Sequence, residues 1–220
     1  MYPMAHVAAA LLLKSRFASA PTPALFLAVL LPDILWFIFS FLGIESTTIV
    51  AGMVQVRYMP YSHSVASVVL FAGVAYAIIA WALQRPALGL AIALGIASNL
   101  PIDLITHFQD IPLLPRGSDV LLGFGLYSNP VLGFAIETAY CVLCWWVYKG
   151  SFELLAAVLF FNLIHIPLLP PAVGQPVPAG AGPMTTLVAV TLLAVETLLA
   201  AVLVWRFSSN PILSRSMGES

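Results

Sequence analysis

The segment Ala87–His107, ALGLAIALGIASNLPIDLITH, begins with an apolar run and ends with the polar side chains of Asn99, Asp103, Thr106 and His107. A helix of about 20 mainly apolar residues is long enough to cross roughly 30 Å of hydrocarbon. Asn99, Asp103 and His107 are spaced at i, i+4 and i+8, so they share one face of that helix. The segment therefore predicts a membrane-spanning helix whose outer end carries a polar stripe.

The composition extends this prediction to the whole chain. Of its 220 residues 61% are hydrophobic and 8% are charged, and the mean hydropathy is +1.03, far above that of soluble globular domains. The apolar runs are too long for barrel strands, so we expect an all-α, polytopic bundle of about six spans with a short N-terminal half-helix. The bundle forms a single domain, 1–207, followed by a disordered polar tail, 208–220. The expected spans are 24–43, 63–83, 87–107, 131–148, 153–169 and 184–205.

The basic residues predict the orientation of the bundle. Six of the eight fall on one side of a six-span arrangement, and Arg57 and Arg116 fall on the other. Because cytoplasmic loops of membrane proteins are enriched in Lys and Arg, both termini are expected in the cytoplasm. No basic run points to nucleic acid, so membrane lipids are the expected partners. The six residues on the cytoplasmic side are Lys14, Arg16, Arg85, Lys149, Arg206 and Arg215.

Ionisable and amide side chains recur at overlapping depths in several of the predicted spans. Such groups are costly in hydrocarbon, so they usually face the bundle interior or a water cavity and serve function. The alternative is that they are hydrogen-bonded contacts between helices, worth about 0.6 kcal/mol each. The set consists of Asp33, His63, Asn99, Asp103, His107, Glu137, Asn162, His165 and Glu196.

The N-terminal segment MAHVAAALLLK is too short to cross a membrane. If Lys14 and Arg16 lie at the cytoplasmic surface, an inward half-helix of about ten residues would place His6 near the bilayer centre. The equally good alternative from periodicity is an amphipathic helix on the membrane surface, with His6 in water.

Several short motifs in order along the chain resemble those of bacterial predicted membrane-bound metal-dependent hydrolases. They are MAHVAAALLLK, LLPDILW, YSHS, SNLPIDLITH followed by IPLLPRG, and GLYSNP leading to Glu137. The resemblance covers roughly residues 4–140 and favours the buried half-helix. It implies a polytopic helical protein whose metal site uses the N-terminal His, the Asp of the first span, the His of SHS and a His-x-x-x-Asp pair. These positions are His6, Asp33, His63, Asn99 and Asp103 here.

This chain departs from that pattern at Asn99, where the family usually has His. An amide oxygen is a poorer zinc ligand than an imidazole. Either His107 substitutes for the missing imidazole or the metal site is weakened.

The leading hypothesis is a metal-dependent hydrolase acting on a lipid or lipid-linked ester or phosphoester at the outer leaflet. The expected cofactor is a divalent metal, most simply zinc, held by His6, His63 and Asp103. Asp33 and His107 are the expected catalytic residues, one as a further ligand and the other as general base. The remaining candidates, Asn99, Glu137 and His165, would orient these groups through hydrogen bonds.

Two alternatives stay open. One is a non-catalytic membrane subunit or scaffold of a larger complex, in which Asn99 marks the loss of the metal. The other is a transporter or proton relay, whose path would use Asp33, Asp103 and Glu196 at different depths.

Overall fold

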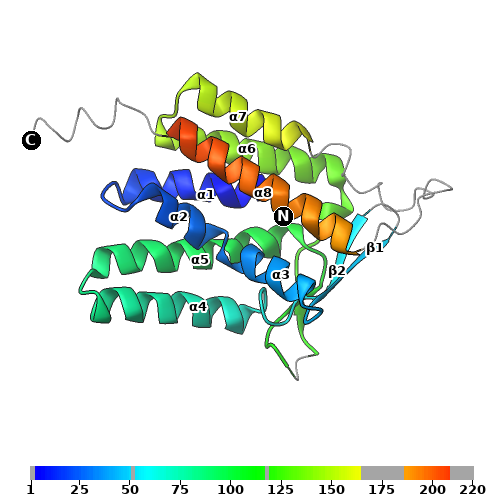
Figure 1. Ribbon diagram of the computed structural model, residues 1–220. Coiled ribbons are helices and arrows are strands. Elements are labelled where there is room, and N and C mark those ends of the chain that lie inside the picture. The colour runs from blue at the N-terminus through cyan, green and yellow to red at the C-terminus, as the bar shows by residue number, and fades with distance from the viewer. Residues whose placement is uncertain (1–2, 51–52, 117–118, 165–185, 209–220) are drawn as a thin grey trace, which may run out of the picture.

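In the computed structural model the chain forms an elongated helical bundle with two small β-hairpins at one end (Figure 1). The structure describes residues 3–50, 53–116, 119–164 and 186–208. The predicted all-α bundle is confirmed as the main architecture. The helices are α1 (Pro3–Arg16), α2 (Thr22–Val29), α3 (Leu31–Phe41), α4 (Val65–Ala77), α5 (Pro86–Thr106), α6 (Pro130–Tyr148), α7 (Phe152–Ile164) and α8 (Thr186–Ser208). The strands are β1 (Ser46–Val50), β2 (Met53–Tyr58), β3 (Ile111–Pro112) and β4 (Leu121–Leu122).

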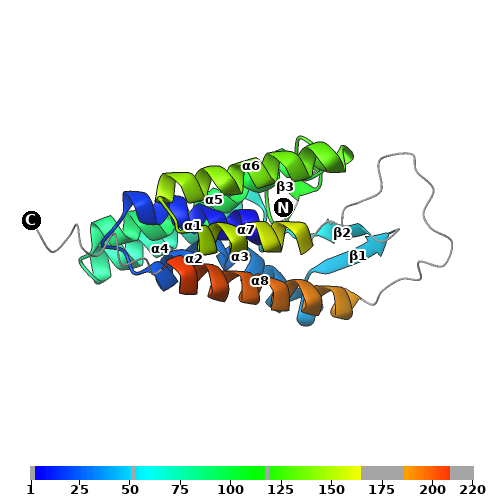
Figure 2. The same ribbon diagram turned by 90° about the horizontal axis from the view of Figure 1, so that it is seen from above.

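Helix α1 is the central element of the bundle and contacts α2, α5, α6, α7 and α8 (Figure 2). Every residue from Met4 to Leu11 is buried, and four of these eight are alanines. Small side chains let neighbouring helices approach closely, as at interfaces between membrane helices. His6 is only 1% exposed, so the buried half-helix is confirmed and the surface helix is excluded.

The first predicted span is broken into α2 and α3, which meet at an angle of 54°. Pro32 lies in the first turn of α3. Because proline has no backbone N–H and its ring clashes with the preceding turn, a helix kinks or breaks at this position. The break places Asp33 in the first turn of a new helix, where backbone N–H groups favour a negative charge.

Helices α4 and α5 form a tight antiparallel pair, and α5 also packs closely on α2. A β-carbon added to Gly95 would lie 2.8 Å from the β-carbon of Ala28. There is no room for a side chain at position 95, so glycine at this position lets α5 pack directly on α2. The polar end of α5 is thereby held beside Asp33.

Four described helical segments are long and apolar enough to cross a membrane, or five if the bent pair α2 and α3 is one span. The four are Val65–Ala82, Pro86–Thr106, Pro130–Tyr148 and Val190–Ser208. Six spans are therefore not confirmed. The predicted span 153–169 is described only as α7, which has 13 residues, and its remainder lies outside the described residues, as does most of the predicted tail.

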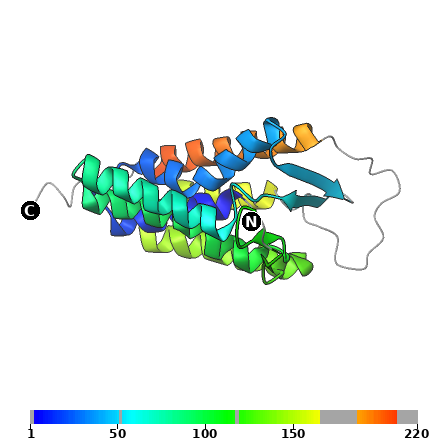
Figure 3. The same cartoon turned by 90° about the horizontal axis from the view of Figure 1, so that it is seen from below.

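The two β-hairpins lie together at one end of the bundle (Figure 3). Strand β1 pairs antiparallel with β2, and β3 pairs antiparallel with β4. The first hairpin joins α3 to α4, and the second joins α5 to α6. The polar end of α5 points toward this end, so the predicted site residues lie just beneath the hairpins.

Candidate functional site: a buried histidine and aspartate cluster

Helix α5 supplies one wall of the candidate site, as its spacing predicts. Asn99 is 1% exposed and Asp103, one turn later, is 2% exposed. His107 is the residue that ends the helix, and its backbone N–H donates to the Asp103 carbonyl at 2.8 Å. The stripe read from the sequence is therefore present and faces the bundle interior.

The Asp103 carboxylate is the meeting point of three imidazoles. Its Oδ1 lies 3.3 Å from His6 Nε2 and 3.7 Å from His107 Nε2. Its Oδ2 lies 3.7 Å from His63 Nε2, which is also 3.5 Å from Asp33 Oδ1. Groups from α1, α3, α5 and the turn before α4 thus converge. We call these residues the His–Asp cluster: His6, Asp33, His63, Asn99, Asp103 and His107.

Asn99 joins the broken span to α1 by its amide nitrogen. Nδ2 donates to Asp33 Oδ2 at 3.2 Å and lies 3.3 Å from His6 Nδ1. Because an amide nitrogen only donates, His6 Nδ1 accepts, and the ring proton of His6 is on Nε2, facing Asp103. Asn99 Oδ1 is buried without a hydrogen-bond partner among the described residues.

His63 is held by a carboxylate acting through a serine, an arrangement that sequence reasoning missed. Ser62 Oγ donates to Glu45 Oε2 at 2.6 Å and lies 2.8 Å from His63 Nδ1. Glu45 Oε1 accepts the backbone N–H groups of Tyr61 and Ser62. A hydroxyl has one proton, so Ser62 must accept from His63, and His63 Nδ1 carries its ring proton.

His107 is also held by a carboxylate, but the contact is direct. Its Nδ1 lies 3.1 Å from Asp110 Oδ1, so Nδ1 donates and Nε2 is directed toward Asp103. The side chain of Asp110 is 25% exposed and that of His107 is 13% exposed. The sequence signal for Asp110 was its position three residues after His107.

The hydrogen bonds of the imidazoles leave negative charge at the cluster that must be balanced. In their neutral forms, His63 and His107 would each direct an Nε2 lone pair at carboxylate oxygens. Lone pair and carboxylate repel each other, and buried ionic groups require a partner of opposite charge. The negative charge of Asp33 and Asp103 must therefore be balanced, by protons on the imidazoles or the carboxyl groups or by a metal ion.

The cluster contains side chains of the types that bind divalent metals, but their positions in the structure do not form a metal-binding group. Metal-ligating histidines typically have their other ring nitrogen bonded to a carboxylate, a carbonyl or water. His107 is bonded in this way to Asp110, whereas His63 is linked to the Glu45 carboxylate only through the Ser62 hydroxyl. Nevertheless, in the described part of the chain no three His, Cys, Asp or Glu side chains form a group that could hold a metal ion. The ligand set His6, His63 and Asp103 thus stays a prediction.

The structure places the last two predicted site residues differently. Glu137, on α6, is fully buried and accepts a hydrogen bond from the Tyr127 hydroxyl at 3.0 Å. The Tyr127 ring lies 6.1 Å from the His107 ring, so Glu137 is linked to the cluster through this tyrosine. His165 lies outside the described residues.

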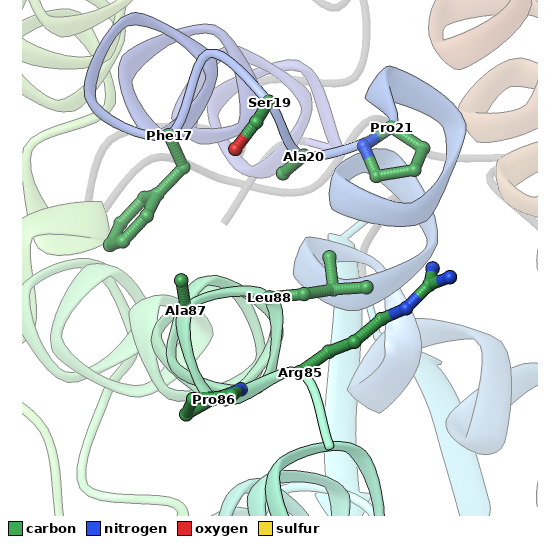
Figure 4. Close-up of a pocket in the computed structure, with 8 residues that line it drawn as sticks. All are labelled: Phe17, Ser19, Ala20, Pro21, Arg85, Pro86, Ala87 and Leu88. Atoms are coloured by element: carbon green, nitrogen blue, oxygen red, sulfur yellow. The ribbon is translucent and has the colours of Figure 1, made fainter. Parts of the chain in front are cut away.

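A pocket of about 360 Å³ lies at the opposite end of α5 and is separate from the cluster (Figure 4). Leu88, one of its lining residues, is eleven positions before Asn99, or roughly 16 Å along the helix. None of the predicted site residues lines it. The lining residues are Phe17, Ser19, Ala20, Pro21, Arg85, Pro86, Ala87 and Leu88.

No family model matches the chain, and neither the curated proteins nor the solved structures contain a match. The resemblance to membrane-bound metal-dependent hydrolases therefore stays a prediction. The case for a function rests on the His–Asp cluster.

Proposed function

We propose that this protein is a membrane-embedded, metal-dependent hydrolase whose reaction centre is the His–Asp cluster. One observation carries the proposal: hydrogen bonds fix the Nδ1–H groups of His63 and His107, so that both Nε2 atoms face the Asp103 carboxylate. The negative charge of this arrangement must be balanced, and a divalent metal would balance Asp33 and Asp103 together. We propose a metal because the cluster has imidazole and carboxylate donors and a negative charge to balance. The distances between these side chains are not part of the argument.

The residues of the cluster have distinct parts in this proposal. Asp103 lies between the imidazoles and sets the negative potential of the centre. His107, oriented by Asp110, is the proposed general base for the attacking water, because its side chain is 13% exposed whereas those of His6 and His63 are 1% and 5% exposed. Asn99 positions Asp33 and His6 through the hydrogen bonds of its amide nitrogen.

The location of the cluster favours a substrate from the membrane. It lies among candidate spanning helices and beneath the hairpins, at one end of the bundle. We propose a lipid or lipid-linked ester or phosphoester as substrate, taken at the outer leaflet of a bacterial inner membrane. This side follows if the opposite end of the bundle, which carries most of the basic residues, faces the cytoplasm.

The geometry speaks less for a transporter. A relay across the membrane needs ionisable groups at successive depths, yet Asp33 and Asp103 meet the same imidazole, that of His63. They form one site at one end of the bundle. The scaffold alternative predicts the same fold with neither bound metal nor hydrolysis.

The test is hydrolysis of lipid esters and phosphoesters by protein purified in mild detergent, followed by mass spectrometry of the products. We expect Asp103→Asn to lose at least about a hundredfold in rate, as is typical when a group essential to catalysis is removed. Glu196→Gln is the matched control, because it also removes a carboxylate from a spanning helix. Equal rates in wild type and Asp103→Asn, or no hydrolysis of either ester class by wild type, would contradict the proposal.

A further inference from the structure

The connection between α5 and α6, described at residues 107–116 and 119–129, lies at a membrane boundary if both helices span the bilayer. Helix α5 has 21 residues and α6 has 19, which correspond to roughly 30 Å each, the thickness of the hydrocarbon. Both are candidate membrane spans. The connection leaves one at the level where the other begins, so it must run along the surface of the bilayer.

This connection exposes large apolar side chains that the bundle does not cover. Phe124 is 84% exposed, the highest value of any large apolar side chain described, and Val120 and Leu121 are about half exposed. At the start of α6, Val131 is 74% exposed. An exposed apolar patch of this kind marks contact with a membrane or another protein.

The exposed apolar side chains of the connection adjoin those of the two spans, because Phe124 N bonds to the Leu104 carbonyl and Val131 is followed by Leu132. Ile105 on α5 is 47% exposed, and Leu132 and Ile136 on α6 are 48% and 43% exposed. In a spanning bundle these positions face lipid. Because the surface of the connection is continuous with that lipid-facing surface, lipid is the occupant it fits.

The main chain of this hairpin is paired close to the exposed apolar side chains. Leu113 N donates to the Val120 carbonyl, in addition to the pairing of β3 with β4. Paired backbone groups can approach hydrocarbon at a lower free-energy cost than unpaired ones. Ile111 on β3 is fully buried, whereas Leu121 on β4 is 49% exposed.

The same hairpin is fastened to the end of α5 that carries the His–Asp cluster. Phe124 N donates to the Leu104 carbonyl and Gly125 N to the His107 carbonyl, both at 2.7 Å. At Gly123, where φ is +149°, a β-carbon would lie 1.9 Å from the Phe108 carbonyl oxygen. The position of Phe124 relative to His107 is thereby fixed by main-chain contacts.

We propose that the α5–α6 connection is a membrane-docking surface, with Leu121, Phe124 and Val131 inserted among the lipid acyl chains of the adjacent leaflet. It holds the lipid surface beside His107 and its partner Asp110, whose side chains are 13% and 25% exposed. If the proposed function is correct, this surface is where a lipid substrate enters. The docking itself requires no chemistry at the cluster.

The test is nitroxide labelling of Phe124→Cys in the full-length protein, reconstituted into phosphatidylcholine vesicles. Oxygen concentrates in the membrane and a nickel chelate stays in water, so the ratio of their collision rates with the label reports its depth. Asp119→Cys, on the same hairpin and exposed, is the matched control. The native cysteines, Cys141 and Cys144, are buried. Wild type treated with the same nitroxide reagent is the control for their reaction with the label.

The proposal predicts an oxygen-to-nickel ratio several-fold higher at position 124 than at position 119. Equal ratios at the two positions would overturn it. If Phe124→Cys does not fold, Leu121→Cys, which also lies in the connection, decides by the same comparison. The readout depends on neither metal nor hydrolysis, so loss of the hydrolase proposal would leave this result unaffected.

Discussion

At the scale of single residues, the site depends on which ring nitrogen of each histidine carries a proton. Asn99 leaves that proton on His6 Nε2, whereas Ser62 and Asp110 put it on Nδ1 of His63 and His107. The three imidazoles are therefore not equivalent. His63 and His107 can offer a lone pair to a cation as they stand, and His6 would first have to move its proton to the other nitrogen.

The Ser62 hydroxyl gives the sharpest test at this scale. In Ser62→Ala, Glu45 Oε2 and His63 Nδ1 would each lose a buried partner, which costs about 1–3 kcal/mol for an unsatisfied group. We expect the free energy of unfolding in detergent to fall by about that amount, with a loss of hydrolysis because His63 is released. Ser98→Ala is the control, since Ser98 bonds only to the Gly95 carbonyl of its own helix. Unchanged stability and activity in Ser62→Ala would show that the Ser62 hydroxyl does not link Glu45 to His63.

The sequence predicts one half of the site better than the other. Asn99, Asp103 and His107 share a helix, so their spacing alone places them together. Glu45 reaches Ser62 across the β1–β2 hairpin, and no periodicity in the sequence connects them. Ser62 is visible beside His63 in the sequence, but its role as a link between two acceptors appears only in three dimensions.

At the scale of elements, backbone breaks decide where the site forms. The predicted first span is two helices because Pro32 interrupts it, and the cluster gains Asp33 at the start of the second helix. The prediction of a helix at residues 24–43 is right in type, but its continuity could not be judged from composition. The hairpins β1–β2 and β3–β4 lie between the predicted spans, and such short strands have too little alternation to be recognised from the sequence.

Gly123 tests the attachment of the second hairpin to α5. Gly123→Ala would force a β-carbon against the Phe108 carbonyl, and a side chain at this φ is strained in addition. We expect the hairpin to detach, seen as faster proteolysis between residues 108 and 130 and as reduced hydrolysis. Gly73→Ala, in α4 with nothing within 4 Å of the added carbon, should be neutral or stabilising by up to about 1 kcal/mol. Equal protease resistance in both variants would mean that the attachment does not depend on Gly123.

At the scale of the whole molecule, the bundle has two unlike ends. The C-terminal ends of α1 and α8 and the turns α4–α5 and α6–α7 lie at one end (Figure 1). These segments carry Lys14, Arg16, Arg85, Lys149 and Arg206. The hairpins and the His–Asp cluster lie at the other end. Segregation of basic residues in this way predicts a cytoplasmic basic end and an outward-facing cluster.

Cysteine accessibility in intact cells tests this orientation. An impermeant maleimide should label Asp119→Cys, in the α5–α6 connection, before the cells are permeabilised. It should label Ser19→Cys, in the exposed turn between α1 and α2, only afterwards. The reverse pattern would place the cluster on the cytoplasmic side.

The central claim is that the His–Asp cluster holds a divalent metal, and elemental analysis tests it most directly. The protein would be purified in mild detergent without chelator or histidine tag, as wild type and as His63→Ala. We expect about one equivalent of zinc, manganese or iron in wild type, because one dication balances Asp33 and Asp103, and loss of that metal in the variant. Wild type free of metal, or equal metal in both proteins, would show that the cluster is not a metal site.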